Sequence, residues 1–166
     1  MILIERITPD TALVFKQVRL RALAESPAAF SSTYDRESQF PDEEWVRRAA
    51  RWGGEGNDAI FLAFDGEAAC GIVGSYIEKE SPERAQVISM WVDPEYRRSG
   101  VGKLLIDTVM EFNRAREIYE LVLMVTSVNM GAIAFYEQLG FRKTGAKSQY
   151  PNDPSIIEYE MMLRLA

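Results

Sequence analysis

The central loop of this sequence, residues 92–105, reads Val92-Asp93-Pro94-Glu95-Tyr96-Arg97-Arg98-Ser99-Gly100-Val101-Gly102-Lys103-Leu104-Leu105. The residues before it, 87–92, are rich in β-branched and aromatic types and predict a buried strand. After the loop, apolar residues recur at helical spacing from 101 to 112 and predict a helix. A strand, a Gly-x-Gly loop and a helix start leave unpaired backbone N–H groups together, which is typical of an anion-binding site.

Two common phosphate-binding loops do not fit this stretch. A Walker A loop requires Ser or Thr after Gly-Lys, but Lys103 is followed by Leu104, and no glycine lies five residues before Gly102. A dinucleotide fingerprint requires a third glycine, and Leu105 occupies that position. The remaining pattern is Arg97-x-x-Gly100-x-Gly102, with local positive charge from Arg97, Arg98 and Lys103.

Composition sets the broad class. The chain has 166 residues, of which 47% are hydrophobic and 27% charged, so we expect one domain over 1–166 with a sizeable core. A formal charge of −6 argues against nucleic acid as the main partner. The absence of a long apolar run argues against a membrane span and a signal peptide, so we expect a cytoplasmic protein.

Histidine is absent, and Cys70 is the only cysteine. This excludes Ser-His-Asp and Cys-His catalysis and histidine-based or cysteine-rich metal sites. Cys70 lies in an apolar stretch and is interpreted as a buried, inert thiol. We expect no metal.

The periodicity of the whole chain predicts an α/β (α+β) fold with a mixed central sheet of about seven strands and about four helices. Residues 28–39 show no clear period, and 148–154 are expected to form a polar loop between the two closing strands. The predicted strands are 2–7, 59–64, 68–78, 85–92, 121–125, 141–146 and 156–165. The first predicted helix begins at Thr8-Pro9 and ends before Pro27. The other three span 41–52, 104–112 and 130–139.

A second block, Asn129 to Phe141, reads Asn-x-x-Ala-x-x-Phe-Tyr-x-x-x-Gly-Phe. Together with Arg97-x-x-Gly100-x-Gly102 it resembles the GCN5-related N-acetyltransferase (GNAT) family, over roughly residues 86 to 141. The resemblance implies the GNAT-like acyl-CoA N-acyltransferase fold. It also implies acetyl-CoA as the donor and a primary amine of a small molecule, amino acid or peptide as the acceptor.

The resemblance implies two contact regions for the coenzyme. The backbone of the strand residues Met90, Trp91 and Val92 would pair with the pantetheine arm. The pyrophosphate would lie against Arg97, Arg98, Ser99, Gly100, Val101, Gly102 and Lys103. A helix N-terminus suits a diphosphate on physical grounds alone. Asn129 is expected to cap a helix, and the family adds a contact with the pantetheine arm.

Catalytic roles also follow from the resemblance. Tyr136 shares an apolar helical face and would otherwise be a core residue, but the family places its hydroxyl near the sulfur as general acid for the departing thiolate. Many members carry a glutamate as general base where this chain has Gln86. Glu78 is therefore our candidate base, with Glu80, Asp35 or a water chain as alternatives.

The acceptor pocket is expected to come from Tyr34, Asp35 and Tyr150, although exposed loop residues are the alternative interpretation. Two other functions stay open at this point: a catalytically silent acetyl-CoA-binding sensor, and a nucleotide-binding domain with an unusual glycine loop. Family analogy leaves a homodimer open, formed through the two closing strands.

Overall fold

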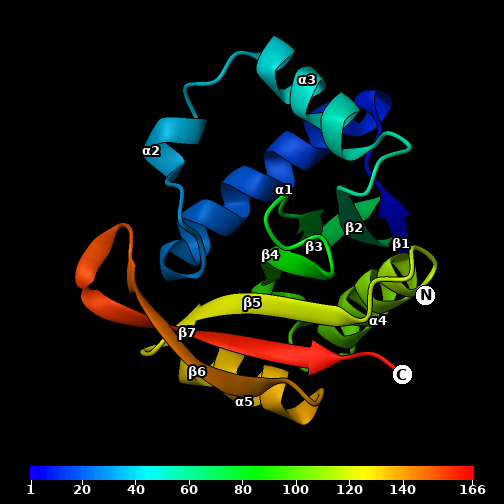
Figure 1. Ribbon diagram of the computed structural model, residues 1–166. Coiled ribbons are helices and arrows are strands. Elements are labelled where there is room, and N and C mark those ends of the chain that lie inside the picture. The colour runs from blue at the N-terminus through cyan, green and yellow to red at the C-terminus, as the bar shows by residue number, and fades with distance from the viewer.

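Seven strands form one mixed sheet in the order β1-β2-β3-β4-β5-β7-β6 in the computed structural model, which describes residues 1–166 (Figure 1). All neighbouring strands are antiparallel except β4 and β5. The strands are β1 (Ile2–Arg6), β2 (Ala59–Asp65), β3 (Ala68–Ile77), β4 (Arg84–Val92), β5 (Glu120–Thr126), β6 (Arg142–Tyr150) and β7 (Asp153–Arg164).

Helices cover both faces of this sheet (Figure 1). Trp45 and Phe15 are buried on the first face, which is covered by α1 (Ala12–Glu25), α2 (Tyr34–Glu37) and α3 (Asp42–Trp52). Leu105 and Tyr136 belong to the second core, under α4 (Val101–Arg114) and α5 (Met130–Gln138). Three 3₁₀ segments, Pro9–Thr11, Pro27–Ala29 and Pro94–Tyr96, complete the chain. Because both faces are covered, the inner strand β2 is almost continuously apolar.

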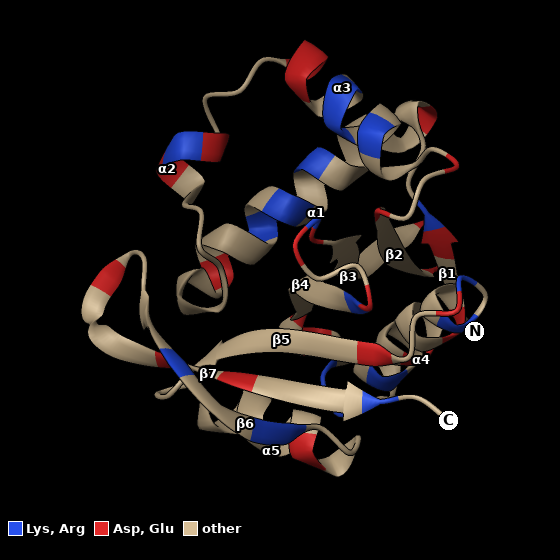
Figure 2. Cartoon of the chain, in the orientation of Figure 1, with Lys and Arg blue, Asp and Glu red and all other residues tan.

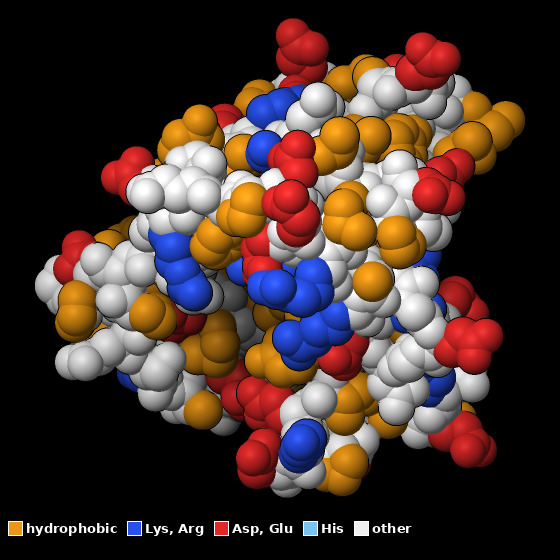
Figure 3. Space-filling view, turned by 90° about the horizontal axis from the view of Figure 1, so that it is seen from above, with side chains coloured by type: hydrophobic (Ala, Val, Ile, Leu, Met, Phe, Trp, Pro, Cys, Tyr) orange, Lys and Arg blue, Asp and Glu red, His pale blue; other side chains and the backbone are white.

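The charges of α3, on the first face, follow its helix dipole. In Figure 2, α3 begins red and continues blue, since Asp42, Glu43 and Glu44 lie in its first turn and Arg51 lies in its last. Acidic residues at a helix start and basic residues at its end are stabilising. Figure 3 views the molecule from this side and shows acidic side chains beside a central group of Lys and Arg, so the positive charge there is locally compensated.

The sheet opens between β4 and β5. The two strands pair only at Arg84, Ala85 and Gln86, and beyond these residues they diverge. A bulge in β4 accompanies the opening: the register with β3 shifts between Ile72 and Gly74, and Ser89 has a positive φ of 56°. A bulge bends its strand and increases the local twist. The residues of β4 after Gln86 therefore have an edge that β5 does not cover.

The predicted fold class and the seven strands are confirmed, with three local differences. The prediction of a loop over 148–154 is wrong, because β6 and β7 continue through these residues as a hairpin with a turn at Pro151 and Asn152. These residues are polar since the hairpin extends past the sheet and is exposed. The short helix α2 lies in the aperiodic stretch, which raises the helix count to five, and α4 begins at Val101, ahead of the predicted 104.

Candidate active site

The divergence of β4 and β5 creates a cavity of about 550 Å³. Of the predicted site residues, it is lined by Glu78, Met90, Asn129, Tyr136 and Tyr150, and Gln86 lies there too. Trp91, Val92 and the glycine loop do not line this cavity, and neither do Tyr34 and Asp35. Both of the latter belong to α2, where Tyr34 is exposed. The structure therefore brings together the residues expected around the thioester and leaves the loop as a separate region.

Tyr136 lies in α5 and is only 8% exposed. Its ring packs edge-on against Phe135 and Phe141, with ring centroids 5.3 and 5.6 Å away, so the ring position is fixed by the core. Its hydroxyl makes no hydrogen bond within the protein, although the residue lines the cavity. Burial raises the pKa of Tyr136 well above its ordinary value, so the hydroxyl stays protonated at neutral pH. A protonated phenol at a cavity is a proton donor.

Asn129 holds the start of α5 at the cavity wall. Its Oδ1 accepts a hydrogen bond from the Ala132 N–H at 3.2 Å, which confirms the predicted N-cap. Because the cap fixes the first turn of α5, it also fixes the direction from which Tyr136, two turns further on, reaches the cavity.

The glycine loop presents a run of free backbone donors. The N–H groups from Arg98 to Lys103 have no acceptor within the protein, and the N-cap Gly100 offers no side chain. Gly100 has a φ of 93° and nothing within 4 Å of the position of an added Cβ. The space around Gly102 is tight, since a Cβ there would lie 3.0 Å from the Phe135 ring. Free N–H groups around open space at a helix start fit a diphosphate.

Arg97 faces away from these donors. Its guanidinium donates to the Val92 carbonyl at 2.9 Å and to Glu25 at the end of α1 at 2.7 Å. Glu25 also accepts from the Trp91 indole at 2.9 Å. These contacts tie the loop and β4 to α1. The charge of Lys103 is likewise engaged, by Asp107 at 2.6 Å.

The Glu25 pair gives a pH-dependent prediction. The hydrogen bond from Arg97, and further ones from Ser26 and Trp91, lower the pKa of Glu25 from 4.5 to about 2. Its contribution to stability is therefore present above pH 4.5 and is lost as the pH falls towards 2. We expect Glu25→Gln to lower the free energy of unfolding at neutral pH by at most about 1 kcal/mol, since the pair is partly exposed. Urea unfolding at several pH values measures this, and a gap that persists at pH 2 would contradict it.

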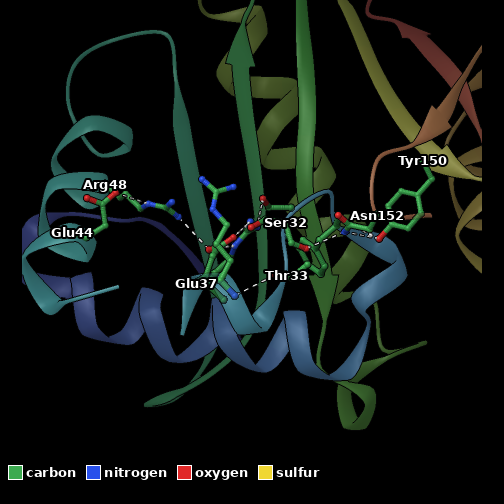
Figure 4. Close-up of polar contacts among 11 residues, drawn as sticks. Ser32, Thr33, Glu37, Glu44, Arg48, Tyr150 and Asn152 are labelled. Carbon is green, nitrogen blue, oxygen red and sulfur yellow. Dashed lines mark hydrogen bonds and ion pairs between the residues drawn. The ribbon is translucent and has the colours of Figure 1, made fainter. Parts of the chain in front are cut away.

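One wall of the cavity, which we call the roof, is formed where residues 27–31 contact the β6–β7 hairpin at residues 148–152 (Figure 4). The Tyr150 hydroxyl lies 2.6 Å from the Phe30 carbonyl and 2.9 Å from that of Pro27. Asn152 donates to the Phe30 carbonyl at 3.2 Å. The β6–β7 hairpin thus holds the segment between α1 and α2 in place. Tyr150 lines the cavity as predicted, but its hydroxyl is engaged in this structural contact.

A buried ion cluster supports the roof from the other side (Figure 4). Glu37 in α2 is 1% exposed and receives two hydrogen bonds from Arg19, at 3.0 and 2.9 Å, and one from Arg48 at 3.1 Å. Burial alone would raise the pKa of Glu37, but the hydrogen bonds and charges of Arg19 and Arg48 hold it below its ordinary value. Arg19 also donates to the Ser89 hydroxyl at 2.7 Å, which ties the β4 bulge to α1. No sequence pattern marks this cluster, because Glu37 lies in the aperiodic stretch 28–39.

Two carboxylates line the cavity. Glu78 accepts a hydrogen bond from the Tyr76 hydroxyl at 3.3 Å. Glu158 in β7 was not predicted, and burial raises the pKa of its carboxyl. The alternation of glutamate with apolar residues over 157–161 is the sequence signal that could have marked it.

Comparison with known proteins identifies the family of the chain. The model of the acetyltransferase (GNAT) family matches residues 21–141, and the chain belongs to this family. Human N-acetyltransferase 8 is 33% identical over 95 residues, which cover 55% of this chain and 41% of the relative. The chain thus spans less than half the length of this curated relative.

Solved structures share the fold along the whole chain. A GNAT acetyltransferase from Streptococcus pneumoniae has a TM-score of 0.81 at 22% identity and covers 100% of both chains. The PaiA N-acetyltransferase from Thermoplasma acidophilum, solved in complex with coenzyme A, has a TM-score of 0.77 at 19% identity and covers 99% of both. At these identities the likeness is one of fold.

No three cysteine or acidic side chains gather closely enough to hold a metal ion. No helix combines the length and apolar character that a membrane span requires.

Proposed function

We propose that this protein transfers the acetyl group of acetyl-CoA to a primary amine of a small molecule, amino acid or peptide. The observation that supports this most directly is the cavity between the diverging strands β4 and β5, with the protonated Tyr136 hydroxyl on its wall. The separate loop of free N–H groups supplies a place for the pyrophosphate.

Each part of the chain has a distinct task in this proposal. The N–H groups of residues 98–103 bind the pyrophosphate, whereas Arg97 and Lys103 are paired with Glu25 and Asp107 and hold the loop in place. The uncovered edge of β4, at Met90, Trp91 and Val92, pairs with the pantetheine arm. A backbone N–H of this edge polarises the thioester carbonyl. Tyr136 donates a proton to the departing sulfur.

Thiol release from acetyl-CoA over a panel of amines tests the proposal. The panel contains polyamines, aminoglycosides, amino acids and peptides, and we expect at least one class to give steady turnover. Thermal unfolding with acetyl-CoA, ATP and NAD is measured in parallel, and only acetyl-CoA is expected to raise Tm. A raised Tm without any turnover would contradict catalysis and support a silent acetyl-CoA-binding sensor. A shift with ATP or NAD alone would contradict both.

A further inference from the structure

Three polar side chains form a row across the C-terminal strands beside the cavity. Glu158 in β7 pairs directly with Thr126 in β5 and with Ser148 in β6. Directly paired residues of antiparallel strands project from the same face, with Cβ atoms roughly 5 Å apart. All three residues line the cavity into which Tyr136 also faces.

Two members of this row lack partners. The Thr126 side chain is 4% exposed, and its Oγ1 is buried without any hydrogen bond. The Glu158 carboxylate makes no hydrogen bond or ion pair within the protein, and burial raises its pKa. Buried polar groups are normally satisfied, so the unpaired Thr126 hydroxyl, with the unpaired and half-buried Glu158 carboxylate beside it, points to a ligand that completes both.

Other carboxylates of the chain differ from Glu158 in this respect. Glu160, on the same strand and face, accepts a hydrogen bond from the Thr144 hydroxyl at 2.9 Å and does not line the cavity. Glu37 is fully paired with Arg19 and Arg48. Glu78 lines the cavity but is bonded to Tyr76. Glu158 is therefore the unpaired carboxylate of this cavity.

The surrounding charges favour a cation at this position. The charged and titratable side chains facing the same cavity are Arg19 from α1, Tyr76 and Glu78 from β3 and the segment after it, Tyr136 from α5, and Tyr150 from β6. The Arg19 charge is balanced by the bidentate contact with Glu37. The net charge that remains comes from Glu78 and Glu158, and it is negative.

We propose that Glu158 and Thr126 form the binding site for the acceptor's primary ammonium group, and that Glu158 takes its proton. The inference rests on the proposed acetyl transfer and moves the role of base from Glu78 to Glu158. The Thr126 hydroxyl oxygen accepts one ammonium hydrogen bond, and the carboxylate accepts another. A carboxylate with a raised pKa is a better proton acceptor near neutral pH than an ordinary glutamate.

One proton leaves the ammonium nitrogen for the Glu158 carboxylate, which frees the nitrogen lone pair. That pair forms the bond to the acetyl carbon, and the carbon–sulfur bond breaks with its electrons on sulfur. The second amine proton replaces the one that Tyr136 gives to the sulfur. Glu158 returns its proton to water.

Glu158→Gln tests the assignment, with the best acceptor of the amine panel. We expect kcat/KM to fall by roughly ten- to a hundredfold, since water can replace part of a missing base. The acid limb of the pH profile of kcat/KM, which reports the Glu158 carboxyl in the wild type, should disappear. Thr126→Val, which keeps the shape and removes the hydroxyl, should raise KM with a smaller effect on kcat. Glu160→Gln is the matched control and should stay within twofold of the wild type.

The Tm of Glu158→Gln separates a binding role from a structural role, because the two roles predict changes of opposite sign. Because the pKa of Glu158 is raised in the folded state, its charge opposes folding above that pKa. Glu158→Gln should therefore raise Tm of the protein without acetyl-CoA at neutral pH, and the gain should vanish in acid where both forms are neutral. A lower Tm would identify a structural carboxylate.

The inference fails if Glu158→Gln keeps its turnover and the acid limb of its pH profile, or if Glu78→Gln alone removes them.

If no amine of the panel is acetylated, the proposed function fails. The site is then probed with n-butylammonium chloride by thermal shift, against potassium chloride at equal ionic strength. A larger rise of Tm with butylammonium in the wild type than in Glu158→Gln supports the ammonium site. Equal shifts overturn it.

Discussion

Replacing Tyr136 by phenylalanine is expected to lower kcat by about 100-fold or more while acetyl-CoA binding is retained, since general acid catalysis contributes roughly 10²–10⁴-fold. The substitution removes only the hydroxyl. The ring keeps its contacts with Phe135 and Phe141, and no hydrogen bond within the protein is lost. The fold should therefore be unchanged.

The measurement for Tyr136→Phe pairs steady-state thiol release with the rise of Tm on addition of acetyl-CoA. Tyr119→Phe is the control, because Tyr119 is exposed and lies between α4 and β5, outside the cavity. Unchanged turnover in Tyr136→Phe would remove Tyr136 from the mechanism. A lost Tm shift would show that the hydroxyl binds the coenzyme and is not confined to a catalytic step.

Replacing Gly100 by alanine is expected to weaken acetyl-CoA binding by roughly 10- to 100-fold, the equivalent of one lost charge-assisted hydrogen bond of about 1.5–3 kcal/mol. Gly100 has a φ of 93°, which alanine rarely adopts. The loop must either keep this strain or relax, and relaxation turns the N–H groups of 98–103 away from a common centre. The added methyl group also projects into the open space around the loop.

Gly66→Ala separates the binding effect from backbone strain. Gly66 lies in the turn between β2 and β3, has a φ of 61°, and also has nothing within 4 Å of an added Cβ. Both variants should lose about 1 kcal/mol of unfolding free energy, the usual order for a left-handed non-glycine residue. Only Gly100→Ala should lose affinity in an acetyl-CoA titration. An equal loss in both, or none in Gly100→Ala, would contradict a pyrophosphate site at this loop.

Four cavity residues lie in or beside the two sequence blocks that carry the family resemblance. The resemblance, rather than periodicity, pointed to Met90, Asn129 and Tyr136 as site residues and aligned Gln86 with the family's glutamate. Periodicity alone predicts Tyr136 as a core residue and Asn129 as a helix cap, and the structure has both features. All four residues line one cavity, because α5 and its cap supply Asn129 and Tyr136 and β4 supplies Met90 and Gln86.

The prediction for residues 148–154 failed for a physical reason. Polar composition usually marks a loop, but here it marks a hairpin that leaves the sheet and is exposed except at Tyr150. Its position over the segment between α1 and α2 depends on the Tyr150 contact with Phe30, residues 120 positions apart. No local pattern contains that information.

The family and the order of strands and helices follow from the sequence alone, as does the expectation of an anion site at the Arg97–Gly102 loop, since each depends on residues close together in the chain. Only the tertiary structure decided which charges are free. Arg97 is held by Glu25, Arg19 by Glu37, and Glu158 is left unpaired beside Thr126. Whether a charged side chain binds a ligand or a neighbour depends on which distant segments the fold brings to it, and that is set by packing of the whole chain.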